Sequence, residues 1–327
     1  MDQSATAPAP ANVTGSDVDE SLTIAVLVPC YNEAQAIEKV VADFASALPN
    51  ATIYVYDNNS TDGTREIAAE AGAVVRTESL QGKGNVVRRM FADVEADVYV
   101  MVDGDDTYNA PDAPSMVAYL RDNHLDMVNG RRVTEISEAY RFGHRFGNRV
   151  LTDLVSYIFG KRFDDMLSGY RIFSRRFVKS FPVMTRGFEI ETELTVHALE
   201  LQLPVGEVPT AYKDRPEGSV SKLSTYKDGF RILKMIAFLA KEERPLQFFS
   251  ILAGVLSIVS LSLATPIVIE FMDTGLVPRF PTAILSTGIM LSALLSFFTG
   301  LVLDTVTHGR VEQKRLRYLA VSNSVES

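Results

Sequence analysis

The chain has 327 residues, more than one average domain, and a formal net charge of -9. Acidic chains of this kind bind nucleic acid poorly, so no nucleic-acid partner is expected. The single cysteine, Cys30, excludes an internal disulfide. The four histidines, His124, His144, His197 and His308, lack the spacing of a zinc site.

The first segment, 1–21, is rich in Ala, Pro, Ser and Asp, which predicts a disordered tail. No apolar signal-peptide core follows Met1. Ordered structure is expected from Leu22, where strand and helix patterns begin to alternate, and this alternation predicts a layered α/β sheet with right-handed crossovers. The predicted strands are 22–29, 51–56, 73–76, 98–102 and 126–129, and the predicted helices are 34–48, 65–71 and 85–94.

The stretch 98–108 changes abruptly from apolar residues to carboxylates. The apolar part predicts a strand buried on both faces, and ligands of such sheets bind beyond the carboxyl ends of the strands. Asp103 and Asp105 would point to opposite faces of a straight strand, but Gly104 lets the chain turn so that both reach one cation. Their oxygens suit Mg²⁺ or Mn²⁺, which also bind substrate diphosphates. A turn with solvated carboxylates fits this stretch equally well.

Polar segments also follow two earlier strands, and a glycine-lysine loop opens the third helix. The segments are Val28-Pro29-Cys30-Tyr31-Asn32-Glu33, Asp57-Asn58-Asn59-Ser60-Thr61-Asp62-Gly63-Thr64 and Gly82-Lys83-Gly84. Together with Asp103-Gly104-Asp105, they resemble family 2 glycosyltransferases with the GT-A fold. The resemblance implies a Rossmann-like mixed sheet flanked by helices. The alternatives are that Asp57 and Asp62 cap a helix and that the glycine-lysine loop is an ordinary turn.

The resemblance also implies roles for single residues. Glu33 and Asp57 would contact the base and ribose of a UDP- or GDP-sugar, and Lys83 would lie near the diphosphate. Asp103 and Asp105 match the metal-binding carboxylates, and Asp105 is also expected to be catalytic. The residues expected to bind the nucleotide sugar are Pro29, Tyr31, Glu33, Asp57, Asn59, Lys83, Asp103 and Gly104.

A second motif lies in the middle of the chain, at 164–171. It resembles the acceptor-side motif of polyprenyl-phosphate sugar transferases such as dolichol-phosphate mannose synthase. The resemblance places Asp165 at the reaction centre, with Asp164 as the adjacent competitor. A lipid phosphate is already largely dianionic at pH 7, so Asp165 is expected either to act as a base or to orient basic residues. Glu191 matches an acidic position of the family, but a solvated acidic helix start is the favoured interpretation there.

Basic residues near this motif are candidates for binding the acceptor phosphate. Arg141, Arg145 and Arg149 recur every four residues and would share a helix face, although a solvated row fits as well. The loop 212–223 resembles the family's loop over donor and lipid phosphate; a charged linker without a role is the alternative. The residues expected at the acceptor phosphate are Arg131, Arg141, Arg145, Arg215, Ser221 and Lys222.

The last third of the chain is apolar and basic. Segment 226–241 places basic residues on one helical stripe, which predicts a helix in a membrane interface. Segments 246–269 and 281–303 contain no charged residue, and each exceeds the ~20 residues needed to cross a bilayer. Basic residues outside these segments put the catalytic domain and both termini in the cytosol, at a bacterial or archaeal plasma membrane.

The expected organisation is a tail (1–21), a GT-A domain (22–224), an interface helix (225–245), a transmembrane hairpin (246–307) and a basic cytosolic tail (308–327). The resemblance implies an inverting transferase that moves a sugar to undecaprenyl or dolichyl phosphate. A processive polysaccharide synthase is disfavoured by the lack of Trp and by only two spans. A non-catalytic nucleotide-sugar-binding scaffold is disfavoured by the intact carboxylates, and a homo-oligomer stays open.

Overall fold

A computed structural model describes residues 22–133, 163–185, 187, 189–213, 238 and 241–322. The chain divides into two compact units. The first, called the sheet unit, comprises Met1–Thr225 and Lys314–Ser327, and the second, called the hairpin unit, comprises Tyr226–Gln313. Most of the expected interface helix, 226–237 and 239–240, lies outside the described residues.

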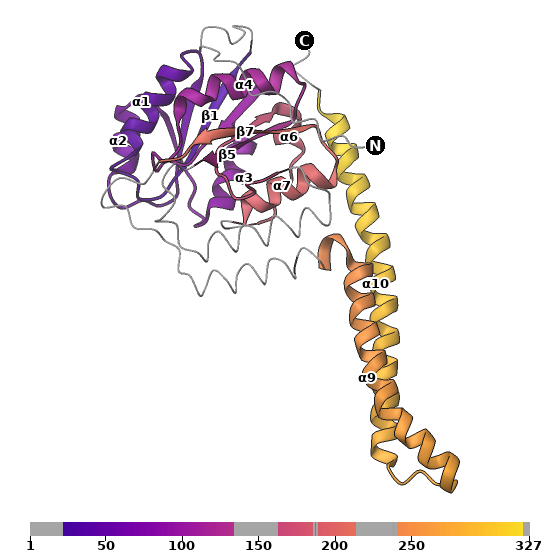
Figure 1. The fold of residues 1–327 in the computed structure, drawn as a ribbon. Helices are drawn as coiled ribbons and strands as arrows, with labels where there is room; N and C mark the ends of the chain where they lie inside the picture. The colour runs from indigo at the N-terminus through magenta and orange to yellow at the C-terminus, as the bar shows by residue number, and fades with distance from the viewer. Residues whose placement is uncertain are drawn as a thin grey trace. The chain divides into compact units, whose positions relative to one another are not determined.

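The sheet unit is built on a seven-stranded sheet in the order β3-β2-β1-β4-β6-β5-β7 (Figure 1). Strand β6 runs antiparallel to both of its neighbours, and the other neighbouring pairs are parallel. The mixed GT-A-type sheet expected from the sequence is therefore confirmed. The strands are β1 (Ile24–Cys30), β2 (Thr52–Asp57), β3 (Val74–Thr77), β4 (Val98–Met101), β5 (Met127–Val133), β6 (Arg171–Ser174) and β7 (Val205–Ala211).

Helices cover both faces of this sheet, which explains why β1 and β4 are apolar throughout. Val26 and Val28 of β1 belong to a core cluster that includes residues of α1 and α4. On the other face, Phe91 of α3 packs edge-on against Phe173 of β6, which stacks on Phe177 of α6. The helices of the sheet unit are α1 (Ile37–Ala47), α2 (Thr64–Glu70), α3 (Lys83–Asp93), α4 (Ala113–Asp122), α6 (Arg175–Ser180) and α7 (Ile190–Glu200), with a short 3₁₀ helix η2 (Ala110–Asp112).

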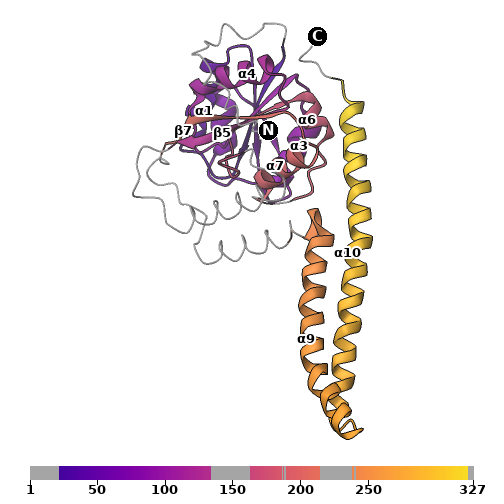
Figure 2. The same cartoon turned by 45° about the vertical axis from the view of Figure 1, so that its right-hand side comes forward.

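The hairpin unit contains α9 (Pro245–Thr274) and most of α10 (Phe280–Ala320), two long helices that lie side by side (Figure 2). Both are long and apolar enough to span a membrane. Their contact follows a seven-residue repeat of mostly small side chains, the spacing of left-handed helix packing. The buried positions of this repeat are Ala253, Ser260 and Ile267 on α9 and Ser286, Ala293 and Gly300 on α10.

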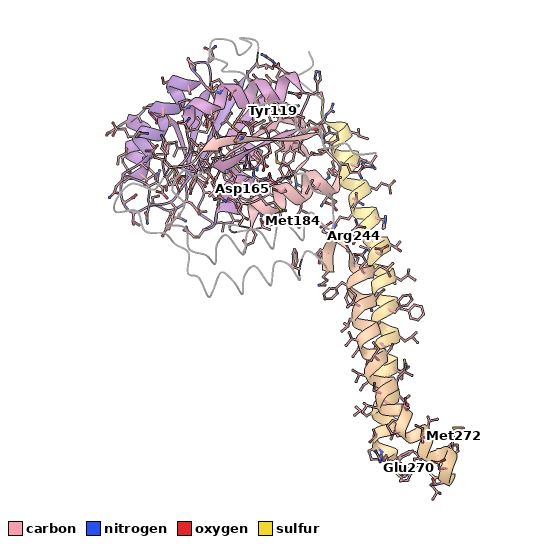
Figure 3. The ribbon with its side chains drawn as sticks, viewed as in Figure 1. Tyr119, Asp165, Met184, Arg244, Glu270 and Met272 are labelled. Carbon is pink, nitrogen blue, oxygen red and sulfur yellow. The ribbon has the colours of Figure 1, made fainter. Side chains whose placement is uncertain are left out.

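Close approach of the backbones explains the small residues in this seam. A Cβ atom added at Gly300 would lie 2.8 Å from Cβ of Phe249, and Ser260 Oγ donates to the carbonyl of Ser286 at 2.7 Å. Glu270 and Met272 lie near the turn that joins the two helices (Figure 3). Outside the seam, the described side chains are largely apolar and exposed, as expected for helices that face lipid.

The end of α10 belongs to the sheet unit, which the expected basic tail did not anticipate. Tyr318 donates its hydroxyl to Asp126 Oδ2 at 2.7 Å, and the guanidinium of Arg176 lies 5.0 Å from the Tyr318 ring centre. Lys314 donates to Glu200 at the end of α7. Some of the basic residues of this segment therefore make contacts within the protein.

Candidate active site

The strands β2, β1 and β4 are parallel neighbours, so their polar carboxyl ends meet at one edge of the sheet. Asp57 ends β2 and is 1% exposed, with Oδ2 accepting from the amide of Ser60 at 3.2 Å. Its Oδ1 is buried and has no hydrogen-bond partner among the described residues. An unpaired buried carboxylate oxygen is costly, and a donor group of a ligand would satisfy it.

Asparagines hold the loops around this carboxylate. Asn58 donates to the carbonyls of Glu78 and Leu80 at 2.8 and 2.9 Å, and accepts from the amide of Gly82 at 2.7 Å. It therefore fixes the loop that opens α3, a role the sequence interpretation missed. Asn59, expected to bind the nucleotide, donates to the carbonyl of Ser79 at 2.9 Å.

The loops after β1 and β2 are also joined directly. Asp62 accepts from the amide of Ala34 at 3.0 Å and from the hydroxyl of Thr64 at 2.5 Å. The amide of Glu33 donates to Thr64 Oγ1 at 2.9 Å. Asp62 therefore holds the two loops together, which is close to the alternative interpretation of this residue as a helix cap. Tyr31, at the same edge, is 38% exposed.

Asp103 and Asp105 follow β4 at this edge. Asp105 is buried and accepts from the hydroxyl of Thr107 at 2.6 Å. The chain bends at Gly104, Asp105 and Asp106, after β4 has ended at Met101, and the left-handed residue of this bend is Asp106, with φ 55°. Gly104 is also required by close packing, because a Cβ atom there would lie 2.6 Å from Sγ of Cys30.

Lys83 completes the centre of the site. It begins α3, and its ammonium donates to Asp103 Oδ1 and to Glu191 Oε1, each at 2.5 Å. Burial alone would lower the pKa of Lys83, but the two carboxylates outweigh it and raise the pKa above its usual value. Glu191 is 5% exposed, so the expected solvated helix start is wrong for this residue.

The carboxylates fit a divalent cation that shares a substrate's oxygens. No group of three or more His, Cys, Asp or Glu side chains able to hold a metal occurs in the part of the chain that the structure describes. Asp103 and Asp105 would supply two hard oxygen ligands, as suits Mg²⁺ or Mn²⁺ bound chiefly through phosphates. Gly169 leaves room for Asp103, because a Cβ atom at Gly169 would clash with the Asp103 carboxylate.

A second charged pair lies beside this centre. Arg132 donates to Asp165 through both ends of its guanidinium, from Nε to Oδ2 at 2.7 Å and from Nη2 to Oδ1 at 2.8 Å. The guanidinium also lies 5.5 Å from the ring centre of Tyr212. Burial would raise the pKa of Asp165, but Arg132 outweighs it and lowers the pKa. Asp165, 6% exposed and labelled in Figure 3, is therefore ionised and a weak base.

The turn that carries Asp165 is held by Glu207 of β7. Glu207 accepts from the amides of Asp164 and Asp165 at 2.9 and 3.2 Å and from the side-chain amide of Asn129 at 2.8 Å. Burial raises the pKa of Glu207 above its usual value. Asp164 itself is exposed, whereas Asp165 is buried against Arg132, which favours Asp165 as the functional aspartate.

The structure therefore brings most of the predicted donor residues to one edge of the sheet. Of the predicted acceptor residues, Arg131 lies in β5, but its neighbour Arg132 makes the contact with Asp165. The remaining acceptor candidates, Arg141, Arg145, Arg215, Ser221 and Lys222, lie outside the described residues. Arg132, Glu191 and Glu207 were not predicted as site residues, and only Glu191 had a signal, its match to an acidic family position.

Comparison with known proteins gives this arrangement a family context. The model of the family described as glycosyl transferase family 2 matches residues 25–181. Glycosyltransferase AglJ of Haloferax volcanii is 33% identical over 298 residues, covering 90% of this chain and 98% of the relative. A dolichyl-phosphate hexose transferase of the same organism is 30% identical over 221 residues, covering 68% of this chain and 95% of that one.

Solved structures share the fold. Glucosyl-3-phosphoglycerate synthase from Mycobacterium tuberculosis, solved with Mn²⁺, UDP and glucosyl-3-phosphoglycerate, superposes with a TM-score of 0.53. It is 23% identical, and the match covers 68% of this chain and 80% of that one. At this identity the likeness is one of fold.

Proposed function

The chain belongs to glycosyltransferase family 2, and on that premise we propose that it transfers a hexose from a nucleoside-diphosphate sugar to a polyprenyl phosphate, undecaprenyl or dolichyl, with inversion. Family membership makes it a hexosyltransferase. The observation that carries the proposal is the pairing of two charged centres at one sheet edge, Lys83 with Asp103 and Arg132 with Asp165. One suits a diphosphate with its cation, and the other suits an anionic acceptor.

The donor side rests on the carboxyl ends of β2 and β4. The unpaired Oδ1 of Asp57 is suited to accept a hydrogen bond from the nucleoside. Asp103 and Asp105 would hold Mg²⁺ or Mn²⁺, and the cation would neutralise charge on the departing diphosphate. The Mn²⁺ and UDP of the glucosyl-3-phosphoglycerate synthase structure support a divalent cation on this fold.

The acceptor side rests on Arg132 and Asp165. Arginine binds phosphate oxygens with its planar fork, and Asp165 fixes the direction of that fork. A phosphate monoester with a second pKa of about 6 needs little deprotonation at pH 7. Asp165 is therefore assigned as a positioning residue rather than a base. The lipid phosphate oxygen forms the new bond to the anomeric carbon as the bond to the nucleoside diphosphate breaks.

A lipid acceptor is supported by two further observations. The relative named dolichyl-phosphate hexose transferase is matched over 95% of its length. Helices α9 and α10 are apolar enough to anchor the protein where such a lipid resides. Basic residues lie just before α9, at Lys241 and Arg244, and in the C-terminal part of α10, from Arg310 to Arg317. Their position favours a cytosolic active site at the plasma membrane of a bacterium or archaeon.

The test is transfer by the purified full chain in lipid nanodiscs, with Mg²⁺ or Mn²⁺, polyprenyl phosphate and a panel of radiolabelled UDP- and GDP-sugars. One donor should move its label into the organic phase. Asp103→Asn and removal of the metal with EDTA should each reduce transfer at least about a hundredfold, because the leaving group loses its cation. Full transfer in EDTA would contradict the proposal. So would the absence of transfer from every donor of the panel.

A further inference from the structure

Lys83 lies where a cation is expected. Its ammonium is 2.5 Å from Asp103 Oδ1, an oxygen of the carboxylate assigned to the metal. The same ammonium is 2.5 Å from Glu191 Oε1, and its side chain is only 10% exposed. The chain by itself therefore places one positive charge between two carboxylates at the candidate metal site.

We propose that Lys83 is an internal counter-cation of this site: it neutralises Asp103 until a divalent cation binds there, and then turns to the donor's diphosphate. The proposal rests on the proposed function, in which Asp103 binds a metal and the donor carries a diphosphate. The physical reason is repulsion, because an ammonium hydrogen-bonded to Asp103 lies close to a divalent cation on the same carboxylate, and like charges at that separation repel each other.

Glu191 makes such an exchange feasible. It lies in the first turn of α7 and is 5% exposed, so its carboxylate remains a partner for the ammonium when Asp103 is taken. A buried ammonium that lost its only partner would be strongly destabilised. With Glu191 beside it, Lys83 stays paired in both arrangements, and the diphosphate supplies the acceptors that Asp103 gives up.

The exchange predicts opposite effects of Lys83→Met on two binding constants, both measured by titration calorimetry on the full chain in nanodiscs. Mn²⁺ alone should bind about tenfold more tightly, because no charged hydrogen bond has to be broken. UDP, titrated in saturating Mn²⁺, should bind about tenfold more weakly, because the diphosphate loses a cation. A residue with a merely structural role would weaken both.

Controls separate this proposal from the proposed function. Lys179→Met removes another partly buried lysine, which donates to the carbonyls of Phe91 and Val94, and should change neither constant. Lys83→Arg keeps the charge, so UDP affinity should stay within about threefold of wild type. If Lys83→Met does not fold, Lys83→Gln replaces it with the same pair of expected shifts.

Asp103→Asn identifies which claim fails. It should abolish Mn²⁺ binding. If it does, but Lys83→Met changes Mn²⁺ and UDP affinity in the same direction or leaves Mn²⁺ affinity unchanged, the counter-cation role is overturned and the metal site stands. If Asp103→Asn binds Mn²⁺ as wild type does, the metal assignment of the proposed function fails, and the counter-cation role fails with it.

Discussion

At the scale of single residues, the site depends on side chains that hold other side chains. Asp165 directs Arg132, and Glu207 holds the turn that carries Asp165. Asn58 similarly fixes the loop that opens α3 at Lys83. Side chains of the candidate site are therefore positioned by partners that lie far away in the sequence.

Glu207→Gln tests this dependence. The new amide can accept with its oxygen, but its NH₂ group faces a backbone amide donor, so the turn at Asp165 should loosen and Arg132 should lose its alignment. We expect kcat/KM for polyprenyl phosphate to fall about tenfold, the worth of a misaligned charged hydrogen bond, while UDP affinity is unchanged. In an Arg132→Lys background, Glu207→Gln should cause little further loss of kcat/KM for polyprenyl phosphate, because Glu207 acts through Arg132.

Glu193→Gln is the matched control for this variant. Glu193 also accepts from two backbone amides, those of Met184 and Thr185, at 2.7 and 2.9 Å. Its substitution should lower thermal stability but leave kcat/KM for the lipid near wild type. An equal loss in kcat/KM for both variants, or a loss of UDP affinity in Glu207→Gln, would show that Glu207 is only a structural residue.

At the scale of helices and strands, the first half of the fold could be predicted from sequence and the second half only in part. Strands β1 to β4 and helices α1 to α3 have clear apolar periods, and their predicted positions agree with the structure within a few residues. Strand β6 has only four residues, and it enters the sheet antiparallel between distant partners. Short strands with non-local pairing carry little periodic signal.

The candidate site shows the same division. Asp103 and Asp105 could be assigned because they directly follow a buried strand. The contact of Lys83 with Glu191 joins residues 108 positions apart, and no local pattern encodes it. The acidic start of α7 looked solvated because acidic residues are common in a first helical turn. Burial of Glu191 depends on the tertiary packing of α7.

Cysteine labelling near the turn between α9 and α10, compared with labelling near the end of the chain, tests the orientation of the hairpin. We expect Thr274→Cys to react with an impermeant maleimide in intact cells and Ser322→Cys not to react, because the flanking basic residues favour the cytosol. Both variants need Cys30→Ala as background, although Cys30 is buried. Reaction at position 322 but not at position 274 would show the opposite orientation and would exclude a cytosolic active site.

At the scale of the whole molecule, the chain combines a family 2 glycosyltransferase sheet with two apolar helices. The solved glucosyl-3-phosphoglycerate synthase, whose structure contains glucosyl-3-phosphoglycerate, shares the fold of the sheet unit. The acceptor proposed for the present chain is instead a phosphate carried on a lipid. The acceptor is thus the central claim, and it can be tested against a soluble phosphate directly.

The most direct measurement compares acceptors with one protein preparation and the donor found active in the panel. Wild-type protein in nanodiscs is offered polyprenyl phosphate, the corresponding polyprenol and 3-phosphoglycerate, and product is quantified by mass spectrometry. The account predicts a polyprenyl-phosphate sugar, no product from the polyprenol and none from 3-phosphoglycerate. Transfer to 3-phosphoglycerate, or equal transfer to the polyprenol without its phosphate, would contradict it.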